Sequence, residues 1–598
     1  MDLNVSNSIL PMQTRQLVFG WIDYSIFIAL LGISLLIGVY FGIYKKQNST
    51  SEYLFGGKRM NYIAVATSIL ASLLSGITFL GIPTEVYLHG SQYFTVCISA
   101  FILGPIIAYI VIPHFNKLQI SSSYEYLELR FTQSIRTLAA SLYIISLFVY
   151  MPVVIYVPAL AFSQVTGFSV HAITPIFSLV CITYTSMGGI KAVVWTDTIQ
   201  FFFTIAGLSA VLIIGLISIG GVSELWRIAD EGQRLQFFNM DPSPFKKNTF
   251  WVITVGMTVS MLSRFGLGQK FVQRFLAVKS QAEMKKAVLL TVTGWAMLQA
   301  ASVFIGLLMY ASYHNCDPLK AKLVNRIDQT LPYYVMDIGA NLRGLPGIFL
   351  AGIVSSALST MSASLNTLAG TIYKTYINRH IADDPKRDSK AANIMKVISV
   401  IAGLITIGAV FVIERLGTVF EMAISFSSVT EGALLGLFTV GMLCPWVGKK
   451  GAITGAYVSL VIMGWIVGST QWYIMNKKIM SPSLPTSIDA CPNSINETLA
   501  GMSSGTTTMP DRLSEEKEEE KAPMIIYHLA VLYYTLLGSL IVIVVSCVTS
   551  FVVGETDLSK VEPDHILPFM RRFLPRKRSY MEIPIKDIER ETNYDAKH

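Results

Sequence analysis

The chain consists of long apolar stretches separated by short polar segments. A bilayer has a hydrocarbon core about 30 Å thick, which an α-helix of about 20 residues crosses. Thirteen stretches reach that length, at residues 21–44, 62–88, 92–114, 137–163, 169–187, 194–219, 249–268, 287–312, 345–374, 393–414, 417–444, 450–470 and 525–553. The sequence therefore predicts an all-α polytopic membrane protein with about 13 transmembrane helices.

The composition supports the same class of protein. Hydrophobic residues make up 52% of the chain and charged residues only 14%, which is too few to cover the surface of a soluble protein of this size. The net charge of +8 does not indicate a nucleic-acid partner, because the Lys and Arg residues lie in short loops between apolar stretches. No polar block is long enough for a second domain, so we expect one membrane domain surrounded by lipid.

The distribution of Lys and Arg predicts the orientation of the spans. Basic residues concentrate in alternate connections, at 45–59, 270–286, 374–387 and 449–450, and again after the last span. Cytosolic loops carry such an excess of positive charge. We therefore expect a multi-pass protein of the plasma membrane, with its N-terminus outside and its C-terminus in the cytosol. The predicted order is an extracellular N-terminus (1–20), a core of twelve spans (21–470), an extracellular loop (471–524), the last span (525–553) and a cytosolic tail (554–598).

The predicted extracellular loop at 471–524 is rich in Ser and Thr and carries an acidic run, so we expect it to be disordered. It contains an N-glycosylation sequon at Asn496, and Asn4 begins another sequon on the same side. Cys316 and Cys491 fall in two predicted extracellular loops, where oxidising conditions allow a disulfide. Two free thiols are the alternative.

The predicted span 345–374 carries six hydroxyl side chains within ten consecutive positions. They are Ser355, Ser356, Ser359, Thr360, Ser362 and Ser364. Hydrocarbon gives such groups no water, so they must face a protein-lined cavity or coordinate something. Helical spacing places most of them on two neighbouring stripes. Neutral oxygens packed so densely suit a small, hard cation that binds reversibly.

The predicted span 62–88 is interrupted in its middle by Gly76, Gly81 and Pro83. These residues free backbone carbonyls, which is tolerated in a membrane only where the gap is buried or lines a cavity. Membrane transporters use such broken helices to hold Na⁺ on free carbonyls and to attract anions to a helix N-terminus. A simple packing kink is the alternative. Taken with the hydroxyl-rich span, the break favours a cation-coupled carrier.

Asp197 follows the glycine pair Gly188 and Gly189 and lies in the first turns of the predicted span 194–219. A helix dipole stabilises a carboxylate at such a position. Asp197 is therefore either a capping acid at the membrane interface or an electrostatic lure on the inward path of a cation.

The motif GGIKAVVWTDTIQ at 188–200 resembles the signature of the sodium/solute symporter family. Three further segments resemble the same family: SEYLFGG at 51–57, SYEYLELRF at 123–131 and LSTMSASLN at 358–366. Two others, GIPTEVY at 81–87 and IYVPAL at 155–160, are similar to the branch that contains the sodium-coupled monocarboxylate, sodium-dependent multivitamin and iodide transporters. The resemblance extends from about residue 20 to about residue 470.

The resemblance implies a symporter core of five-plus-five inverted repeats with broken helices, at about 62–219 and 249–444. It also implies a Na⁺ site formed by the carbonyls of Ala71, Leu74 and Ser356 and the hydroxyls of Ser359 and Thr360. Asp197 matches the acid that the family has near the inner exit. Ser75, Thr78 and Tyr156 would lie beside the substrate. Hydrogen bonding between helices is the alternative for these side chains.

Two positions bear on the cargo. Iodide carriers of this branch have a glutamine where this chain has Thr78, which disfavours iodide. Glu431 departs from the branch pattern, which has a small or hydroxyl residue there. A carboxylate at that depth is costly unless it is protonated, paired or hydrated. We expect Glu431 either to alter a second cation site, to bring proton sensitivity, or to be a neutral, hydrogen-bonded acid.

These features predict a Na⁺-coupled symporter that imports a small organic anion, such as a monocarboxylate, biotin or pantothenate, by alternating access. A neutral solute (sugar, inositol or choline) or iodide is the alternative cargo, and a sodium-binding sensor or channel-like protein is the alternative of another class. The chain has no nucleotide loop and no metal-spaced His/Cys cluster, so we expect neither an enzyme nor a cofactor, with Na⁺ as the coupling ion. A monomer and a homo-oligomer both fit the sequence.

Overall fold

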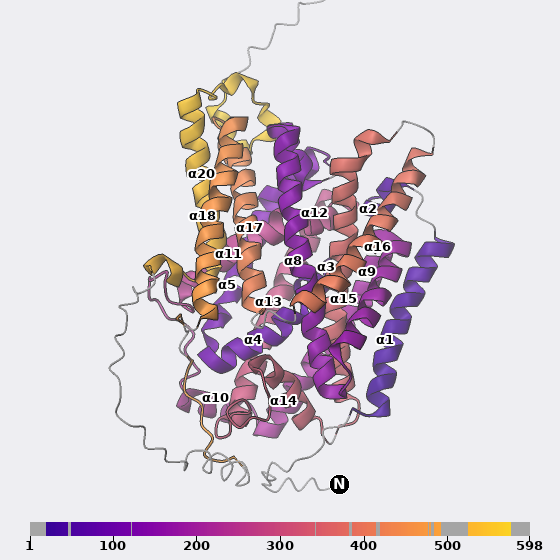
Figure 1. Ribbon diagram of the computed structural model, residues 1–598, viewed down its shortest axis with the longest axis vertical. Coiled ribbons are helices and arrows are strands. Elements are labelled where there is room, and N and C mark those ends of the chain that lie inside the picture. Colours follow the sequence, from indigo (N-terminus) through magenta and orange to yellow (C-terminus); the bar gives the residue numbers. More distant parts are fainter. Residues whose placement is uncertain are drawn as a thin grey trace, which may run out of the picture.

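The computed structural model describes residues 19–45, 49–120, 122–340, 342–381, 386–413, 419–476, 478–479, 483–491 and 524–575. These residues form helices joined by turns and loops and contain no β-strand beyond one isolated bridge between Met60 and Val278. Most of the long helices run roughly along the long axis of the molecule, with α1 at one edge and α18 and α20 at the opposite edge (Figure 1). The predicted all-α class is confirmed.

The long helices are α1 (Trp21–Val39), α3 (Tyr62–Leu73), α4 (Gly76–His89), α5 (Val96–Ile106), α8 (Gln133–Thr166), α9 (Val170–Ile219), α13 (Gln281–Tyr313), α15 (Leu345–Ile372), α16 (Arg387–Ile413), α17 (Val419–Leu443), α18 (Lys449–Met475) and α20 (Tyr534–Val553). Shorter helices are α2 (Thr50–Phe55), α6 (Ile112–Lys117), α7 (Ser123–Arg130), α10 (Val222–Glu231), α11 (Met257–Met261), α12 (Gln269–Phe275) and α14 (Thr330–Ile338). Two π-helical segments, η4 (Val252–Gly256) and η5 (Leu262–Leu267), flank α11.

Ten helices among the described residues are long and apolar enough to cross a membrane, and the bent pair α3–α4 makes up to eleven. A shorter apolar helix, Val252–Leu267, lies where the sequence predicts a further span. A many-spanning membrane protein is therefore confirmed, whereas the count of thirteen stays a prediction.

The 50-residue helix α9 covers two predicted spans. A straight helix of that length would be about 75 Å long, more than twice the thickness of the hydrocarbon core. Gly189 interrupts it with φ 52° and ψ −154°, so that two helices meet at a kink. Only glycine adopts such angles without strain. The predicted spans 169–187 and 194–219 thus adjoin at Gly189, without a separate loop between them.

The predicted break in the span 62–88 is present, and it lies at Leu74 and Ser75. Leu74 leaves the helical region with φ −80° and ψ 82°, and the two half-helices are bent by 54°. Ser75 then caps α4, which continues through Pro83. The prediction that the gap includes Gly81 and Pro83 is wrong. Proline removes only one donor, and a helix packed among neighbours tolerates that loss.

Helix α15 lies at the centre of the bundle, and 94% of its 18-residue apolar stretch is buried. Small residues bring its neighbours close. A Cβ on Gly352 would lie 3.1 Å from the Cα of Thr204 in α9, and one on Gly347 would lie 2.5 Å from the Cα of Asp23 in α1. Asp23 also accepts a hydrogen bond of 2.8 Å from the backbone nitrogen of Gly347. The hydroxyl-rich helix is therefore enclosed by protein, as its composition requires.

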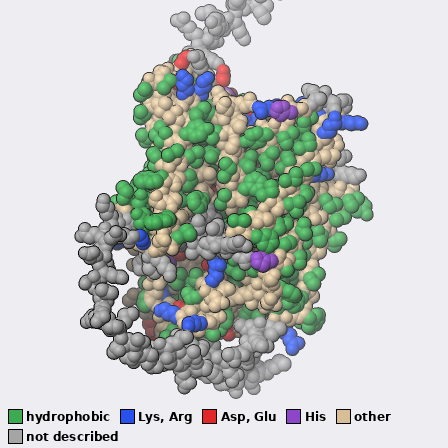
Figure 2. Space-filling model, in the orientation of Figure 1, with side chains coloured by type: hydrophobic (Ala, Val, Ile, Leu, Met, Phe, Trp, Pro, Cys, Tyr) green, Lys and Arg blue, Asp and Glu red, His purple; other side chains and the backbone are tan. Residues whose placement is uncertain are grey.

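The outer surface is apolar where lipid is expected. A broad area of hydrophobic side chains covers the face shown in Figure 2, and most Lys and Arg side chains lie toward its two ends. Side chains such as Leu36 in α1, Ile401 in α16 and Val548 in α20 are more than half exposed. These helices pack one side against the bundle and present the other to lipid.

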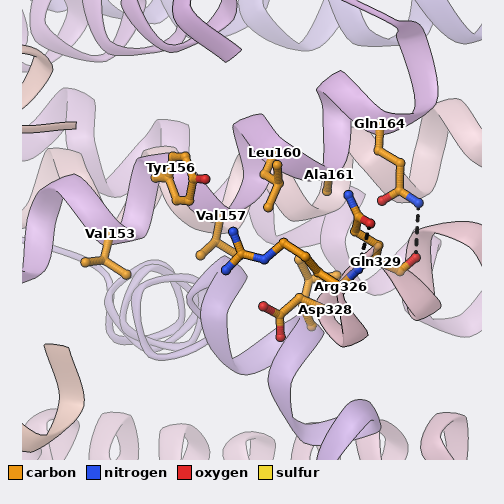
Figure 3. Close-up of a pocket in the computed structure, with 10 residues that line it drawn as sticks. Val153, Tyr156, Val157, Leu160, Ala161, Gln164, Arg326, Asp328 and Gln329 are labelled. Atoms are coloured by element: carbon orange, nitrogen blue, oxygen red, sulfur yellow. Dashed lines mark hydrogen bonds between the residues drawn. The ribbon is translucent and has the colours of Figure 1, made fainter. Parts of the chain in front are cut away.

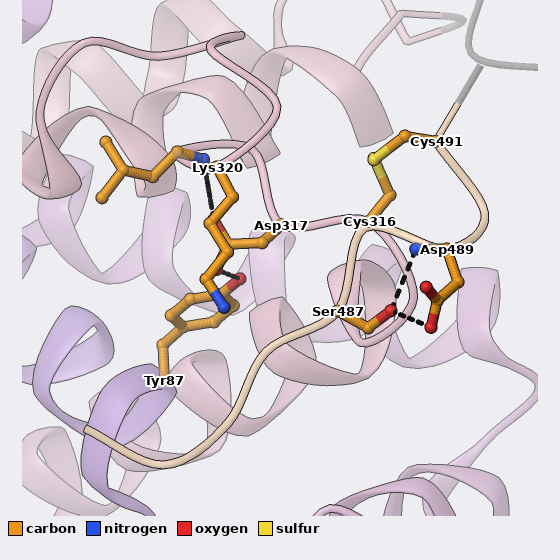
Figure 4. The surroundings of a disulfide bond; sticks show 8 residues. Tyr87, Cys316, Asp317, Lys320, Ser487, Asp489 and Cys491 are labelled. Atoms are coloured by element: carbon orange, nitrogen blue, oxygen red, sulfur yellow. Dashed lines mark hydrogen bonds between the residues drawn. A yellow bond between two sulfur atoms is a disulfide. The ribbon is translucent and has the colours of Figure 1, made fainter. Parts of the chain in front are cut away.

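A cap of loops covers the end of the bundle that holds α10 and α14 (Figure 1). The structure joins Cys316, after α13, to Cys491 by a disulfide with a Cα–Cα distance of 5.0 Å (Figure 4). Next to it, Asp317 accepts a hydrogen bond of 3.0 Å from the hydroxyl of Tyr87 in α4. Asn4 and Asn496, the predicted glycosylation sites, lie outside the described residues.

Candidate functional site

The break between α3 and α4 lies against the middle of α15. The hydroxyls of Ser72 and Ser359 are hydrogen-bonded at 3.0 Å. The hydroxyl of Thr360 donates to the carbonyl of Ser72 at 3.2 Å and to that of Ser356, in its own helix, at 2.9 Å. The hydroxyl-rich segment of α15 thus faces the last turn of α3.

The five residues expected to hold Na⁺ belong to these two facing segments. Ala71 and Leu74 lie in the last turn of α3 and at the break, where carbonyls lack helical N–H partners. Ser356, Ser359 and Thr360 lie on neighbouring turns of α15. All five residues are at most 1% exposed. Their chemistry, neutral oxygens in a dry environment, fits a monovalent cation that is held weakly enough to leave again.

Asp197 is fully buried and belongs to a charged network beside these residues. Its carboxylate accepts hydrogen bonds from Ser68 at 2.8 Å and from Ser362 at 3.4 Å. It also forms a salt bridge of 3.0 Å with Arg274, whose second nitrogen donates to the hydroxyl of Ser72 at 3.0 Å. The partners of Asp197 are thus buried side chains, and both interpretations of its position along the membrane normal stay predictions. Arg274 connects Asp197 directly to the break.

The three residues expected beside the substrate separate into two places. The hydroxyls of Ser75 and Thr78 are hydrogen-bonded at 3.2 Å at the start of α4. Thr78 lines a cavity of about 140 Å³, on the side of α8 that carries Tyr150. Tyr156 lines a different and smaller pocket of about 20 Å³, so Thr78 and Tyr156 do not share one cavity.

The smaller pocket lies between α8 and the loop before α14 (Figure 3). Val153, Tyr156 and Val157 form its apolar side, and Arg326 and Asp328 its charged side. It is too small for an organic solute, since one water molecule already needs about 10–15 Å³ of such space. The larger cavity is the candidate solute site.

A model of the sodium:solute symporter family matches residues 53–459 of the chain. The chain belongs to this family. The symporter is thus a multi-pass membrane transporter, and an enzyme is excluded.

The symporter is similar to several named transporters along most of its length. It is 35% identical to sodium-coupled monocarboxylate transporter 1 of Homo sapiens, over 94% of each chain. It is 33% identical to the sodium-dependent multivitamin transporter of Oryctolagus cuniculus, over 93% of this chain and 86% of the relative. Its fold is similar to that of a Na⁺-coupled sialic acid symporter, with a TM-score of 0.70 and 23% identity over 89% of this chain and 98% of the other.

The larger cavity of the symporter extends from the break toward α12 and α17. Its apolar and aromatic lining includes Leu147, Tyr150 and Phe438. Its charged lining consists of Arg264, Lys270 and Glu431. The cavity therefore has the usual composition of a small-molecule site, mostly apolar with a few polar groups.

Glu431 is paired. The Nε of Arg264 lies 2.7 and 2.8 Å from its two carboxylate oxygens, and the hydroxyl of Ser263 donates to its backbone carbonyl at 2.9 Å. An ion pair makes a carboxylate tolerable at this depth. Glu431 thus needs neither a proton nor a second cation to be stable, although both remain hypotheses for its function.

Sequence reasoning missed three functional candidates, Arg264, Lys270 and Arg274. It treated Lys270 and Arg274 only as topology signals, and it did not consider Arg264. A signal was available for Arg264, because its charge lies inside the predicted span 249–268, where a lone cation requires a partner.

Proposed function

We propose that this protein is a Na⁺-coupled symporter of the plasma membrane that imports a small organic anion, a monocarboxylate or an anionic vitamin. The observation that carries the proposal is the contact between the α3–α4 break and the hydroxyl turns of α15, made of buried neutral oxygens. The relatives named as sodium-coupled monocarboxylate and sodium-dependent multivitamin transporters support the same coupling ion and the same class of cargo.

In the proposed mechanism, Na⁺ binds to the carbonyls of Ala71, Leu74 and Ser356 and to the hydroxyls of Ser359 and Thr360. The ion then bridges α3 and α15, which belong to different repeats in the implied symmetry. An ion that bridges the two repeats stabilises one arrangement of the repeats relative to each other. Ion binding is thereby coupled to the side of the membrane to which the solute site opens. Each Na⁺ that enters a negative interior gains about 2.3 kcal/mol per 100 mV, a co-transported monoanion loses the same electrical amount, and the concentration gradient of Na⁺ supplies the drive.

In this proposal, Na⁺ leaves its site toward the cytosol along a path past Asp197. Asp197 holds Arg274, and Arg274 donates to Ser72 at the ion site. A departing Na⁺ is attracted by the carboxylate while the guanidinium keeps the attraction moderate. From the positive-inside rule we infer that the exit past Asp197 opens to the cytosol and that the N-terminus is outside.

Uptake by oocytes that express the chain tests the proposal. Labelled lactate, pyruvate, nicotinate, biotin, pantothenate, iodide, glucose and choline are supplied in Na⁺ medium and in a medium where an inert organic cation replaces Na⁺. We expect saturable uptake of one or more of the organic anions in Na⁺ medium alone. Na⁺-independent uptake, or current without solute, would contradict symport.

The ion site is tested by Thr360→Ala, which removes one proposed ligand. We expect the Na⁺ concentration for half-maximal uptake to rise at least about tenfold. Thr367→Ala is the matched control, because Thr367 is also a buried hydroxyl of α15 but bonds the carbonyl of Ala363 in its own helix at 2.8 Å. Equal Na⁺ dependence in the two variants would remove Thr360 from the site.

A further inference from the structure

The charged groups at the larger cavity are arranged so that one positive charge is left over. Arg264 is neutralised by Glu431 at 2.7 Å, and Arg274, close by, is neutralised by Asp197 at 3.0 Å. These four groups are the charged neighbours that act electrostatically on Lys270. Two pairs cancel, so Lys270 is the basic group of the cluster that has no carboxylate of its own.

Lys270 has no carboxylate within ion-pairing distance among the described residues. Its ammonium nitrogen lies 4.8 Å from the centre of the Phe271 ring, and its side chain lines the cavity. An ammonium that lines a protein cavity is costly without a counter-ion, and an aromatic face offsets only part of that cost. The group that would complete its environment is an anion in the cavity.

From this arrangement we propose that Lys270 binds the carboxylate of the solute and that Glu431 sets the charge that the cavity accepts. The inference rests on the proposed function and deepens it. A monoanion brings the cluster to neutrality, a neutral solute leaves one positive charge unpaired, and a dianion leaves one negative charge in excess. The proposed Na⁺ site has its own neutral oxygen ligands, so Na⁺ is not counted among the charged side chains that line the cavity, Arg264, Lys270 and Glu431.

Glu431 sets the charge that the cavity accepts by forming an ion pair with Arg264. With the carboxylate in place, Arg264 is paired and contributes no net charge to the solute site. Without it, the cavity presents two cations, Arg264 and Lys270, which matches a dicarboxylate. The aromatic lining, including Tyr124, Tyr143 and Tyr150, faces the organic part of either solute. Glu431 is thus a positioning residue for charge selectivity.

The test compares Na⁺-driven uptake of three probes in oocytes: nicotinate, its neutral amide nicotinamide, and the dicarboxylate succinate. We expect the unsubstituted chain to prefer nicotinate. Lys270→Gln should raise the apparent KM for nicotinate at least about tenfold and leave the Na⁺ dependence of the residual uptake unchanged. Glu431→Gln should raise the ratio of succinate to nicotinate uptake at least about tenfold.

Two further variants keep the result interpretable if Glu431→Gln reaches the surface poorly. Arg264→Gln combined with Glu431→Gln removes both charges and preserves the net charge, so it should retain the preference for nicotinate. Lys285→Gln, which removes a cation near the start of α13 whose ammonium lies over Tyr109, is the control and should change neither KM nor selectivity. Surface labelling normalises every rate to the protein present.

Two results would overturn the inference. One is an unchanged KM in Lys270→Gln, and the other is a loss of nicotinate preference in the charge-balanced double variant equal to that in Glu431→Gln. In either case, Na⁺-driven uptake by the unsubstituted chain would still support the proposed function. Absence of Na⁺-driven uptake of any organic anion by the unsubstituted chain would overturn both.

Discussion

At the scale of single residues, the salt bridge between Asp197 and Arg274 is a buried charge pair beside the proposed ion site. Their side chains are 0% and 3% exposed. Removing one partner of a buried pair leaves an uncompensated charge, at a cost of about 3–5 kcal/mol, whereas removing both is often neutral. We therefore expect Asp197→Asn to lower the melting temperature in detergent strongly, and Asp197→Asn combined with Arg274→Gln to regain most of the loss. Size-exclusion chromatography after heating measures both.

An exposed ion pair provides the control for that prediction. Glu224 and Arg227 in α10 pair at the surface, where solvent screens the interaction so that it contributes little to stability. Glu224→Gln should therefore leave the melting temperature nearly unchanged. If the double variant at Asp197 and Arg274 melted as early as the single variant, the interpretation as a charge pair would fail.

The same scale shows which parts of the site a sequence can reveal. The orientation of the Ser359 and Thr360 hydroxyls toward the protein interior was predictable, because hydroxyls that face lipid have no hydrogen-bond partners there. The pairing of Arg264 with Glu431 was not, since 167 positions separate the two residues and no local pattern says which cation will meet which acid. Lys270 escaped notice for a related reason: a lysine near the end of a span ordinarily marks topology.

At the scale of elements, α9 depends on Gly189. Its φ of 52° lies in the left-handed region, where an alanine would be strained by about 1–3 kcal/mol. We expect Gly189→Ala to lower the melting temperature and the amount of protein at the cell surface. Gly408→Ala in α16 is the control, because a Cβ there meets nothing within 4 Å and helix propensity favours alanine. Equal behaviour of the two variants would show that the kink relaxes without a glycine.

The α3–α4 break shows how closely glycine and proline residues in a sequence locate an interruption within a helix. Gly76 and Pro83 predicted an interrupted helix, and the structure contains one, but its non-helical residues are Leu74 and Ser75. Ser75 decides the position, since its hydroxyl accepts a hydrogen bond from the backbone of Thr78 and starts a new helix. A capping serine in the middle of an apolar span is the local signal that sequence reasoning left unused.

At the scale of the whole molecule, the loops separate into two groups as the charge pattern predicts. The helices α10 and α14, from predicted extracellular loops, lie at one end, and α2 and the helical turns after α20 lie toward the other (Figure 1). Such a separation arises when successive spans run in opposite directions, and the distribution of Lys and Arg predicts this alternation. The merging of two spans into α9 was not predictable, because apolar stretches on either side of a short polar turn look alike whether or not the helix continues.

The disulfide allows a direct test of which end faces outward. Cys316 and Cys491 are joined, Cys97, Cys181 and Cys444 are buried, and Cys547 lies in α20. On intact cells, an impermeant reductant followed by an impermeant maleimide should label the chain, and Cys316→Ser combined with Cys491→Ser should abolish that labelling. The double variant should also melt earlier, because a cross-link over 175 positions stabilises by about 2–5 kcal/mol. Labelling seen only after permeabilisation would place this end in the cytosol and reverse the orientation of every span.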